Sequence, residues 1–313
     1  MSPAPLISIV APFYNESEGV EIFHERMVSV VGGMDGLRFE LVCVNDGSDD
    51  DTLARLRRLA ESDARVRVID LSRNFGKEAA LSAGLDAARG DAVIPIDADL
   101  QDPPELIPAL IAQWRNGFEV VLARRVDRDT DTFMKRWTAG LFYRLHNLIG
   151  DVRIPENVGD FRLLDRRVAD ALRALPERCR FMKGMFAWLG FRTAVVDYRR
   201  APRAAGRSKF SGWRLWNLAI EGITGFSTVP LRIWTYIGVA VSFTAFAYAA
   251  FIVGRTLLLG ADVPGYASLI VIMLFLGGVQ LIGIGVIGEY VGRIYLETKQ
   301  RPVYLVRERI ERG

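Results

Sequence analysis

The chain has 313 residues, half of them hydrophobic and a quarter charged, and its 40 basic and 37 acidic side chains leave a formal charge of +3. This composition excludes a disordered chain, and so small a net charge gives no reason to expect nucleic-acid binding. With only two cysteines and two histidines, a disulfide scaffold, a cysteine-rich zinc site and a multi-histidine site are also excluded. A bound metal would need carboxylate ligands, which favours Mg²⁺ or Mn²⁺.

Short β-branched runs alternate with segments of helical spacing along the first part of the chain. We expect strands at 6–11, 39–44, 66–71, 92–96 and 119–123, and helices at 19–31, 51–62, 77–89 and 104–114. This alternation predicts an α/β fold with a mostly parallel, Rossmann-like sheet covered on both faces. The glycine motifs of dinucleotide folds and P-loop NTPases are missing from the sequence.

Acidic turns follow three of these strands, at the sheet edge where ligands of α/β folds bind. They read Pro12-Phe13-Tyr14-Asn15-Glu16, Asn45-Asp46-Gly47-Ser48-Asp49-Asp50-Asp51 and Asp97-Ala98-Asp99-Leu100-Gln101-Asp102. The first two could simply cap helices. Carboxylates spaced like Asp97 and Asp99 would repel each other unless a cation or several donors lay between them. Together the three turns indicate a nucleotide and metal site.

The charge pattern changes abruptly near the C-terminus. Between residues 233 and 288 the only charged side chains are Arg255 and Asp262, which leaves apolar runs at 233–254 and 265–288. Each run is long enough to cross a bilayer core of ~30 Å. The alternative is a pair of buried helices in a soluble bundle, which usually keep a polar stripe.

Basic residues flank the apolar runs on both sides, and the short loop between them holds a single arginine. The positive-inside rule then places both termini in the cytoplasm, with the protein in the cytoplasmic membrane. We expect a cytoplasmic domain at 1–230, a transmembrane hairpin at 231–292 and a basic cytoplasmic tail at 293–313.

Two further segments interleave apolar and basic side chains at helical spacing, at about 132–150 and 211–226. We expect helices lying in the membrane interface, although helices packed on the domain core would show a similar pattern. A lipid phosphate would need cations for its headgroup. The candidates are Arg124, Arg136, Arg207 and Lys209, for which a solvated basic face is the alternative.

The order of P-F-Y-N-E, V-N-D-G-S-D-D-D-T and D-A-D-L-Q-D resembles the GT-A glycosyltransferases of family 2. The segments 71–78, 159–164, 207–210 and 287–293 narrow the resemblance to the polyprenyl-phosphate glycosyltransferases. Within these, the chain is most similar to the bactoprenol glucosyltransferases and more distantly to the dolichol-phosphate mannose synthases. The resemblance covers about residues 6–305. The Q-x-x-R-W motif of processive synthases is missing, which indicates transfer of a single sugar.

The resemblance assigns roles to the acidic turns. Asp99 and Gln101 are the first-choice ligands of a Mg²⁺ or Mn²⁺ ion that would stabilise the diphosphate of the donor, with Asp97 binding directly, through water or to the ribose. Glu16 and Asp46 would contact the nucleoside, and Pro12 and Tyr14 would shape the base pocket.

A phosphate monoester is largely ionised at neutral pH and can attack an anomeric carbon without a strong base. Asp160 could accept its residual proton or hold a sugar hydroxyl, with Arg162 orienting it or binding the acceptor phosphate. A structural Asp160–Arg162 pair is the alternative. Direct displacement would invert the anomeric centre.

The leading hypothesis is therefore transfer of glucose from UDP-glucose to undecaprenyl phosphate. The alternatives are another sugar (N-acetylglucosamine, mannose or a modified arabinose) and a non-catalytic membrane scaffold or lipid-translocating protein. Gly288-x-x-x-Gly292 permits close helix contact and suggests a homo-oligomer, which the resemblance implies is a tetramer.

Overall fold

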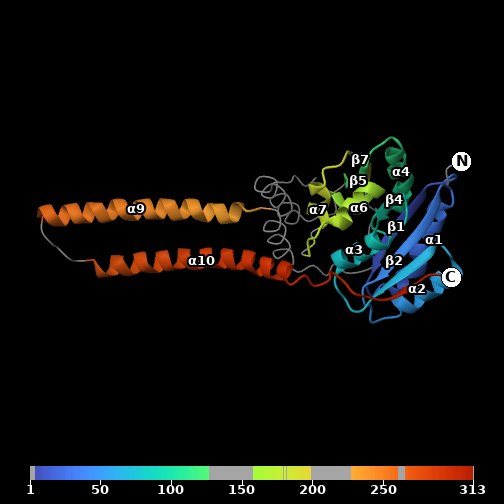
Figure 1. Cartoon of the computed structure of the whole chain (residues 1–313), viewed down its shortest axis with the longest axis horizontal. Helices are drawn as coiled ribbons and strands as arrows, with labels where there is room; N and C mark the ends of the chain where they lie inside the picture. The colour runs from blue at the N-terminus through green and yellow to red at the C-terminus, as the bar shows by residue number, and fades with distance from the viewer. Residues whose placement is uncertain are drawn as a thin grey trace.

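The computed structural model describes residues 4–126, 158–178, 180, 182–198, 227–259 and 265–312. It shows an α/β body from which two long helices extend side by side (Figure 1). The expected fold class is confirmed, and each expected strand and helix of the first part of the chain appears within three residues of its predicted bounds.

The strands of the described residues form one eight-stranded sheet in the order β7-β5-β6-β4-β1-β2-β3-β8. Neighbouring strands are parallel except that β6 runs antiparallel to β4 and β5, and β8 runs antiparallel to β3. The strands are β1 (Leu6–Phe13), β2 (Arg38–Asn45), β3 (Val66–Leu71), β4 (Ala92–Pro95), β5 (Val120–Arg125), β6 (Val158–Asp165), β7 (Thr193–Tyr198) and β8 (Val306–Ile310).

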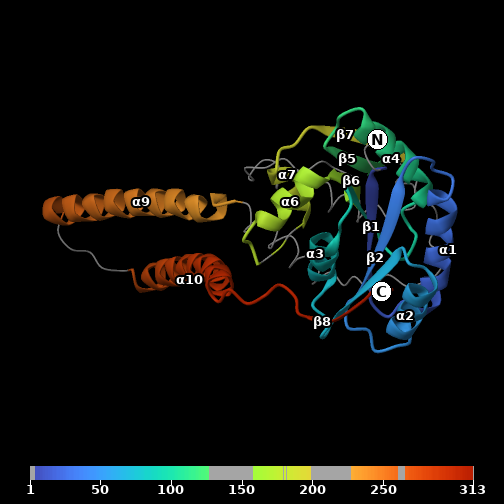
Figure 2. The ribbon, with the colours of Figure 1, turned by 45° about the vertical axis from the view of Figure 1, so that its right-hand side comes forward.

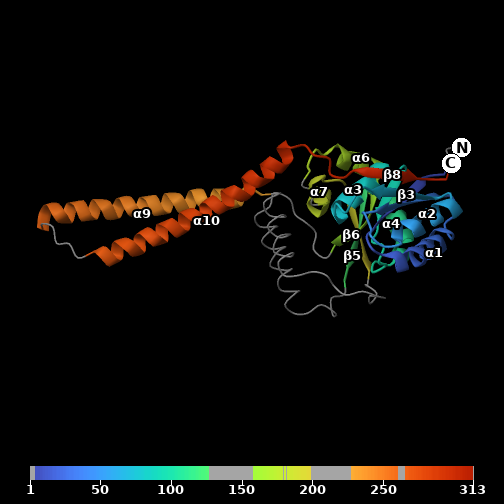
Figure 3. The same ribbon diagram turned by 90° about the horizontal axis from the view of Figure 1, so that it is seen from below.

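Helices cover both faces of this sheet because successive strand residues point to opposite sides. In β2, Leu41 and Cys43 pack in one core cluster, and Val42 and Val44 pack in the other. The first cluster takes side chains from α1 (Val20–Val31), α2 (Thr52–Ser62) and α4 (Ile107–Arg115). The second takes them from α3 (Lys77–Ala87), α6 (Arg166–Ala174) and α7 (Met182–Trp188). Figure 3 shows α6 and α1 on opposite sides of the sheet.

The two long helices are α9 (Val229–Leu259) and α10 (Tyr266–Thr298). Within the described part of the chain, two helical stretches are long and apolar enough to cross a membrane, Ile233–Arg255 and Phe275–Thr298, and neither is buried inside the protein. Their apolar side chains, such as Phe246 and Leu281, are largely exposed. Length, composition and exposure agree with the hairpin expected from the sequence.

The end of the chain differs from the basic tail expected at 293–313. Helix α10 continues to Thr298, and residues 306–310 then form β8 at the edge of the sheet beside β3. Figure 2 shows the chain leaving α10 and returning to the body at β8. The charged sequence Val306-Arg307-Glu308-Arg309-Ile310 lacks the buried pattern of the inner strands because an edge strand keeps one side in solvent.

Candidate active site

The acidic turns converge where the sequence predicted, at the carboxyl edge of the parallel strands. β6 adds a further carboxylate because it runs the other way and therefore begins at this edge. Its register with β4 pairs Ala92 with Asp165 and Val93 with Leu164. β6 begins at Val158, so Asp160 lies near this edge, two residues into the strand, and Asp97 follows β4 by two residues.

Lys77 lies between these two carboxylates. Its Nζ is 2.7 Å from Asp97 Oδ1, 2.9 Å from Asp97 Oδ2 and 2.7 Å from Asp160 Oδ2. Burial opposes the charge of Lys77, but the carboxylates of Asp160 and Asp97 prevail and raise its pKa above the ordinary lysine value. Burial raises the pKa of Asp97, and the charge of Lys77 opposes that rise.

Lys77 is a site residue that the sequence reasoning did not select. It is the first residue of α3, and Gly76 before it has a φ of +97°, a conformation that favours glycine. The segment 71–78 carried the family resemblance, but only the fold shows that its lysine meets carboxylates 20 and 83 positions further on.

The expected metal ligands in the turn after β4 differ in their exposure to solvent. Asp99 is exposed and its Oδ1 accepts a hydrogen bond from the backbone N–H of Gln101 at 3.1 Å. Leu100 between them has a φ of +53°, which costs a non-glycine residue about 1 kcal/mol, and its side chain packs on the first core cluster. Gln101 is buried, and its Nε2 has no hydrogen-bond partner among the described residues. Next to it, the Tyr198 hydroxyl donates to buried Asp102.

A divalent cation fits this edge only if the protein and the bound nucleotide sugar both supply ligands to it. Among the described residues, no three carboxylate, histidine or cysteine side chains converge to hold a metal alone. Asp97 is engaged by Lys77, whereas Asp99 is exposed and its one described hydrogen bond is to the Gln101 backbone N–H. Mg²⁺ and Mn²⁺ bind oxygen ligands and accept several of them from water and phosphate. A small number of protein ligands is therefore sufficient.

The Asp46 carboxylate organises a neighbouring loop. It is 3% exposed, and its two oxygens accept hydrogen bonds from the backbone N–H groups of Phe75 (2.8 Å) and Gly76 (3.0 Å). Burial raises the pKa of Asp46, and these hydrogen bonds oppose the rise. Asp46 therefore fixes the loop that leads into Lys77, besides the nucleoside contact expected for it.

The loop after β1 is joined to the loop after β2. The backbone N–H of Asn15 donates to Ser48 Oγ at 3.1 Å, and that of Glu16 donates to Thr52 Oγ1 at 3.0 Å. Tyr14 and Glu16 are exposed at this edge, while Pro12 is half-buried within β1. These three residues therefore line the same edge as Asp46.

Of the basic residues expected to bind the acceptor phosphate, the structure describes Arg124 and Arg162, and these two differ in accessibility. Arg124 is exposed at the end of β5 and forms a two-point ion pair with Asp197 of β7, at 2.7 and 2.9 Å. Arg162 is buried; it donates to the backbone carbonyls of Gly159 and Asp160, and its guanidinium lies 4.0 Å from the centre of the Phe186 ring. Burial lowers the pKa of Arg162 to about 10.

This burial argues against an acceptor-binding role for Arg162, since its guanidinium supports the backbone at the start of β6. The expected Asp160–Arg162 pairing takes a different form: Arg162 donates to the backbone carbonyl of Asp160, and the Asp160 carboxylate forms an ion pair with Lys77. Arg136, Arg207, Lys209 and the helices expected at 132–150 and 211–226 lie outside the described residues.

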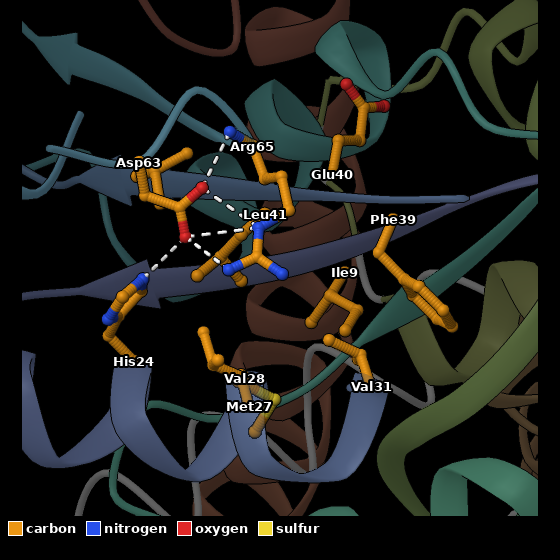
Figure 4. A pocket seen from close by; sticks show the side chains of 11 residues that line it. Ile9, His24, Met27, Val28, Val31, Phe39, Glu40, Leu41, Asp63 and Arg65 are labelled. Carbon is orange, nitrogen blue, oxygen red and sulfur yellow. Dashed lines mark hydrogen bonds and ion pairs between the residues drawn. The ribbon is translucent and has the colours of Figure 1, made fainter. Parts of the chain in front are cut away.

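A small depression between α1 and the sheet lies apart from this edge (Figure 4). It lies over the amino-terminal half of β2, and the Asp63 carboxylate there meets His24 Nε2 at 3.0 Å and Arg65 Nη2 at 2.7 Å. The remaining lining is mostly apolar, and no expected site residue belongs to it. The expected metal and nucleoside residues thus lie at the carboxyl edge and not around this depression.

Comparison with known proteins extends over both parts of the chain. Residues 8–173 match glycosyl transferase family 2, and residues 229–294 match the GtrB C-terminal hairpin. The bactoprenol glucosyl transferase of Shigella phage SfX is 55% identical over 303 residues, covering 97% of this chain and 99% of the relative. The prophage bactoprenol glucosyl transferase homolog of Escherichia coli K12 is 54% identical over 301 residues, covering 96% and 98%.

A mannosyltransferase of Pyrobaculum calidifontis, solved with GDP-Man and Mn²⁺, aligns with 96% of this chain and 86% of its own at 18% identity and a TM-score of 0.48, too distant a likeness to support an argument. The family match spans more than half of the chain, and the phage relatives cover nearly all of it. Together with the acidic carboxyl edge of a mostly parallel sheet, these matches show that the chain belongs to glycosyl transferase family 2 and is a glycosyltransferase with a GT-A fold.

Proposed function

We propose that the protein transfers a single glucose from UDP-glucose to undecaprenyl phosphate at a membrane. The observation that carries this proposal is the identity with bactoprenol glucosyl transferases across both the catalytic body and the hairpin. An acidic edge for a nucleotide sugar and an apolar hairpin beside a lipid acceptor are the two parts that such a reaction needs.

The donor half of the site uses the turns at the carboxyl edge. Tyr14 and Glu16 lie on the loop joined to that of Asp46, and we assign to them, with Pro12, the contacts to the base and ribose. Asp99 and Gln101, assisted by Asp97, are the residues that would hold Mg²⁺ or Mn²⁺. When bound, the cation neutralises the charge that grows on the leaving diphosphate.

The acceptor half centres on Asp160. An oxygen of the lipid phosphate attacks the anomeric carbon while the bond from that carbon to the diphosphate oxygen breaks, and the bonding electron pair leaves with the UDP. Attack opposite the leaving group inverts the anomeric centre. Asp160 would accept the residual phosphate proton or hold a sugar hydroxyl, and its ion pair with Lys77 fixes where its carboxylate lies. Arg124, Arg136, Arg207 and Lys209 are the proposed phosphate-binding cations.

We place both ends of the hairpin in the cytoplasm and the protein in the cytoplasmic membrane. The basic flanks support this orientation. The fold adds a second argument: β8 follows α10 and pairs with β3 from before α9. A hairpin that spans the membrane would therefore return the chain to the side from which it left. The Gly288-x-x-x-Gly292 pattern permits close helix contact between copies of the chain, and we propose that the protein forms a tetramer.

The direct test supplies membranes containing the protein with undecaprenyl phosphate and radiolabelled nucleotide sugars, one donor at a time. Label from UDP-glucose should move to the organic phase in the presence of Mg²⁺ or Mn²⁺ and stay aqueous when the cation is chelated. Preferential transfer from UDP-N-acetylglucosamine, GDP-mannose or a modified-arabinose donor would show that the donor sugar is not glucose. The proposed transfer to a lipid phosphate would still hold. Absence of transfer from every donor would contradict the proposed acceptor.

A further inference from the structure

Strand β8 connects the membrane hairpin directly to the loops of the donor site. It begins eight residues after the end of α10, and its register with β3 pairs Ile69 with Arg309, Asp70 with Glu308 and Leu71 with Val306. Arg307 is therefore skipped in the ladder and forms a β-bulge. Bulges turn a side chain out of the regular alternation and are common beside active sites.

The bulge aims Arg307 at the end of β3. Its Nη2 donates to the carbonyl oxygen of Ser72 at 2.6 Å, and its Nη1 lies 3.4 Å from Asp70 Oδ2. The Asp70 side chain is fully buried, and Arg307 is its cationic partner among the described residues. A buried carboxylate is costly without such a partner. Arg307 thus holds the point where β3 passes into the loop 72–76.

A second path leads from Asp70 to the same loop. Asn45 Nδ2 donates to Asp70 Oδ1 at 2.8 Å, and the next residue, Asp46, holds the backbone N–H groups of Phe75 and Gly76. Lys77 follows directly. Arg307 therefore fixes the start of the loop through Ser72 and its end through Asp70, Asn45 and Asp46.

We propose that Arg307 is a positioning residue that couples the membrane hairpin to the donor site by holding the loop 72–76 in its binding geometry. The connection between α10 and β8 is itself fastened to the body: Glu297 accepts from the Arg178 backbone N–H at 2.9 Å, and the Tyr304 hydroxyl donates to Asp86 at 2.6 Å. The location of the hairpin is thereby transmitted to the loop. The inference rests on the proposed function in one respect only: it names a nucleoside diphosphate as the ligand whose binding depends on the geometry of this loop.

The test compares Arg307→Ala with Arg309→Ala in the purified full-length protein. Arg309 is an exposed arginine on the same strand, and among the described residues its side chain forms no hydrogen bond or ion pair; its removal changes the net charge equally. The first readout is amide hydrogen exchange without ligand. Exchange at Phe75 and Gly76 should rise at least fivefold in Arg307→Ala, stay unchanged in Arg309→Ala, and stay unchanged in β4 of both.

The second readout is UDP binding with Mn²⁺, followed by donor kinetics. Arg307→Ala should raise the Kd for UDP and the KM for the donor at least fivefold with kcat within twofold, and Arg307→Lys should recover part of the loss because an ammonium can serve one of the two acceptors. If Arg307→Ala folds poorly, Asp70→Asn replaces it and should raise exchange at the same amides.

The outcomes separate the two proposals. Unchanged exchange at Phe75 and Gly76 in Arg307→Ala, or an equal rise in Arg309→Ala, overturns the positioning role whatever the ligand. Raised exchange in a protein whose wild type binds no UDP supports the positioning role and contradicts the proposed donor.

Discussion

Asp97, two residues after β4, and Asp160, near the start of β6, are joined by Lys77, whose ammonium lies 2.7 Å from an oxygen of each. Three parts of the sequence thus meet at one point of the sheet edge. The lysine offsets one of the two negative charges, so the pair can remain close without a cation directly between them. With exposed Asp99 nearby, the edge keeps an excess of negative charge that favours a divalent cation.

Replacing Lys77 by Met should therefore abolish the arrangement while keeping the bulk of the side chain. We expect transfer to fall by at least about 100-fold, the usual effect of losing one fixed charge at a reacting centre. The measurement is the rate of glucose transfer to lipid with saturating donor and metal. Lys77→Arg keeps the charge and should retain more activity; equal activity of Lys77→Met and wild type would contradict the role.

Asp99→Asn should separate metal binding from folding. The Asp99 side chain is exposed and its described hydrogen bond is local, so the thermal stability of the variant should match that of wild type. An amide is a weaker metal ligand than a carboxylate, and we expect transfer to fall by at least about 100-fold. Transfer rates across a Mn²⁺ titration measure this. Near-normal turnover at low Mn²⁺ would rule out Asp99 as a ligand.

The sheet edge was predictable, but the pairing within it was not. The ends of β1, β2 and β4 can be located to within two residues from β-branched runs, and parallel strands place their carboxyl ends together. Asp160 reaches this edge only because β6 runs antiparallel and begins there, and a one-residue slip of β6 against β4 would turn its side chain to the other face of the sheet. Lys77 escaped selection for the same reason, since its partners are set by long-range pairing.

The same limit applies at the C-terminus. Val306–Ile310 carries three charged residues and resembles a solvated tail, and only its pairing with β3 makes it a strand. Arg307 could not be distinguished from Arg309 by sequence, because the bulge that selects it exists only in the paired state.

Gly47→Ala tests the close contact between the loop after β2 and the loop 72–76. Gly47 has a φ of +63°, and a Cβ there would lie 2.3 Å from the Arg73 carbonyl carbon. Both the backbone conformation and the clash oppose a side chain, so we expect a loss of roughly 1–3 kcal/mol in stability. The loss would appear in thermal unfolding, together with weaker UDP binding. Gly33→Ala is the control, since nothing lies within 4 Å of its added Cβ; equal stability of the two variants would contradict the contact.

Asp63 should make stability depend on acid pH at a site remote from catalysis. Hydrogen bonds from Arg65 lower the pKa of Asp63 strongly, burial opposes this, and His24 adds to the lowering. Because the folded pKa lies below the unfolded value, the stabilisation is present above about pH 4 and is lost as the pH falls through the folded pKa. Asp63→Asn should cost roughly 1–2 kcal/mol at pH 7, and the difference from wild type should shrink below about pH 4. Denaturant unfolding across pH measures this, with exposed Asp35→Asn as a control; a difference that persists undiminished at low pH would assign the loss to packing.

Substitution of Arg124 tests acceptor binding without a change in the stability of the fold. Its ion pair with Asp197 is exposed, and the hydrogen bond from Arg124 lowers the pKa of Asp197. Exposed pairs contribute little to folding, so neither Arg124→Ala nor Asp197→Ala should change thermal unfolding appreciably. If Arg124 binds the lipid phosphate, Arg124→Ala should raise the KM for undecaprenyl phosphate about tenfold or more, because a charge-assisted contact to an anion is lost. Asp197→Ala keeps the guanidinium and removes its competitor, so its KM should stay equal or fall. A raised KM in Asp197→Ala as large as that in Arg124→Ala would show that the two strands need the pair itself, and that Arg124 does not contact the acceptor.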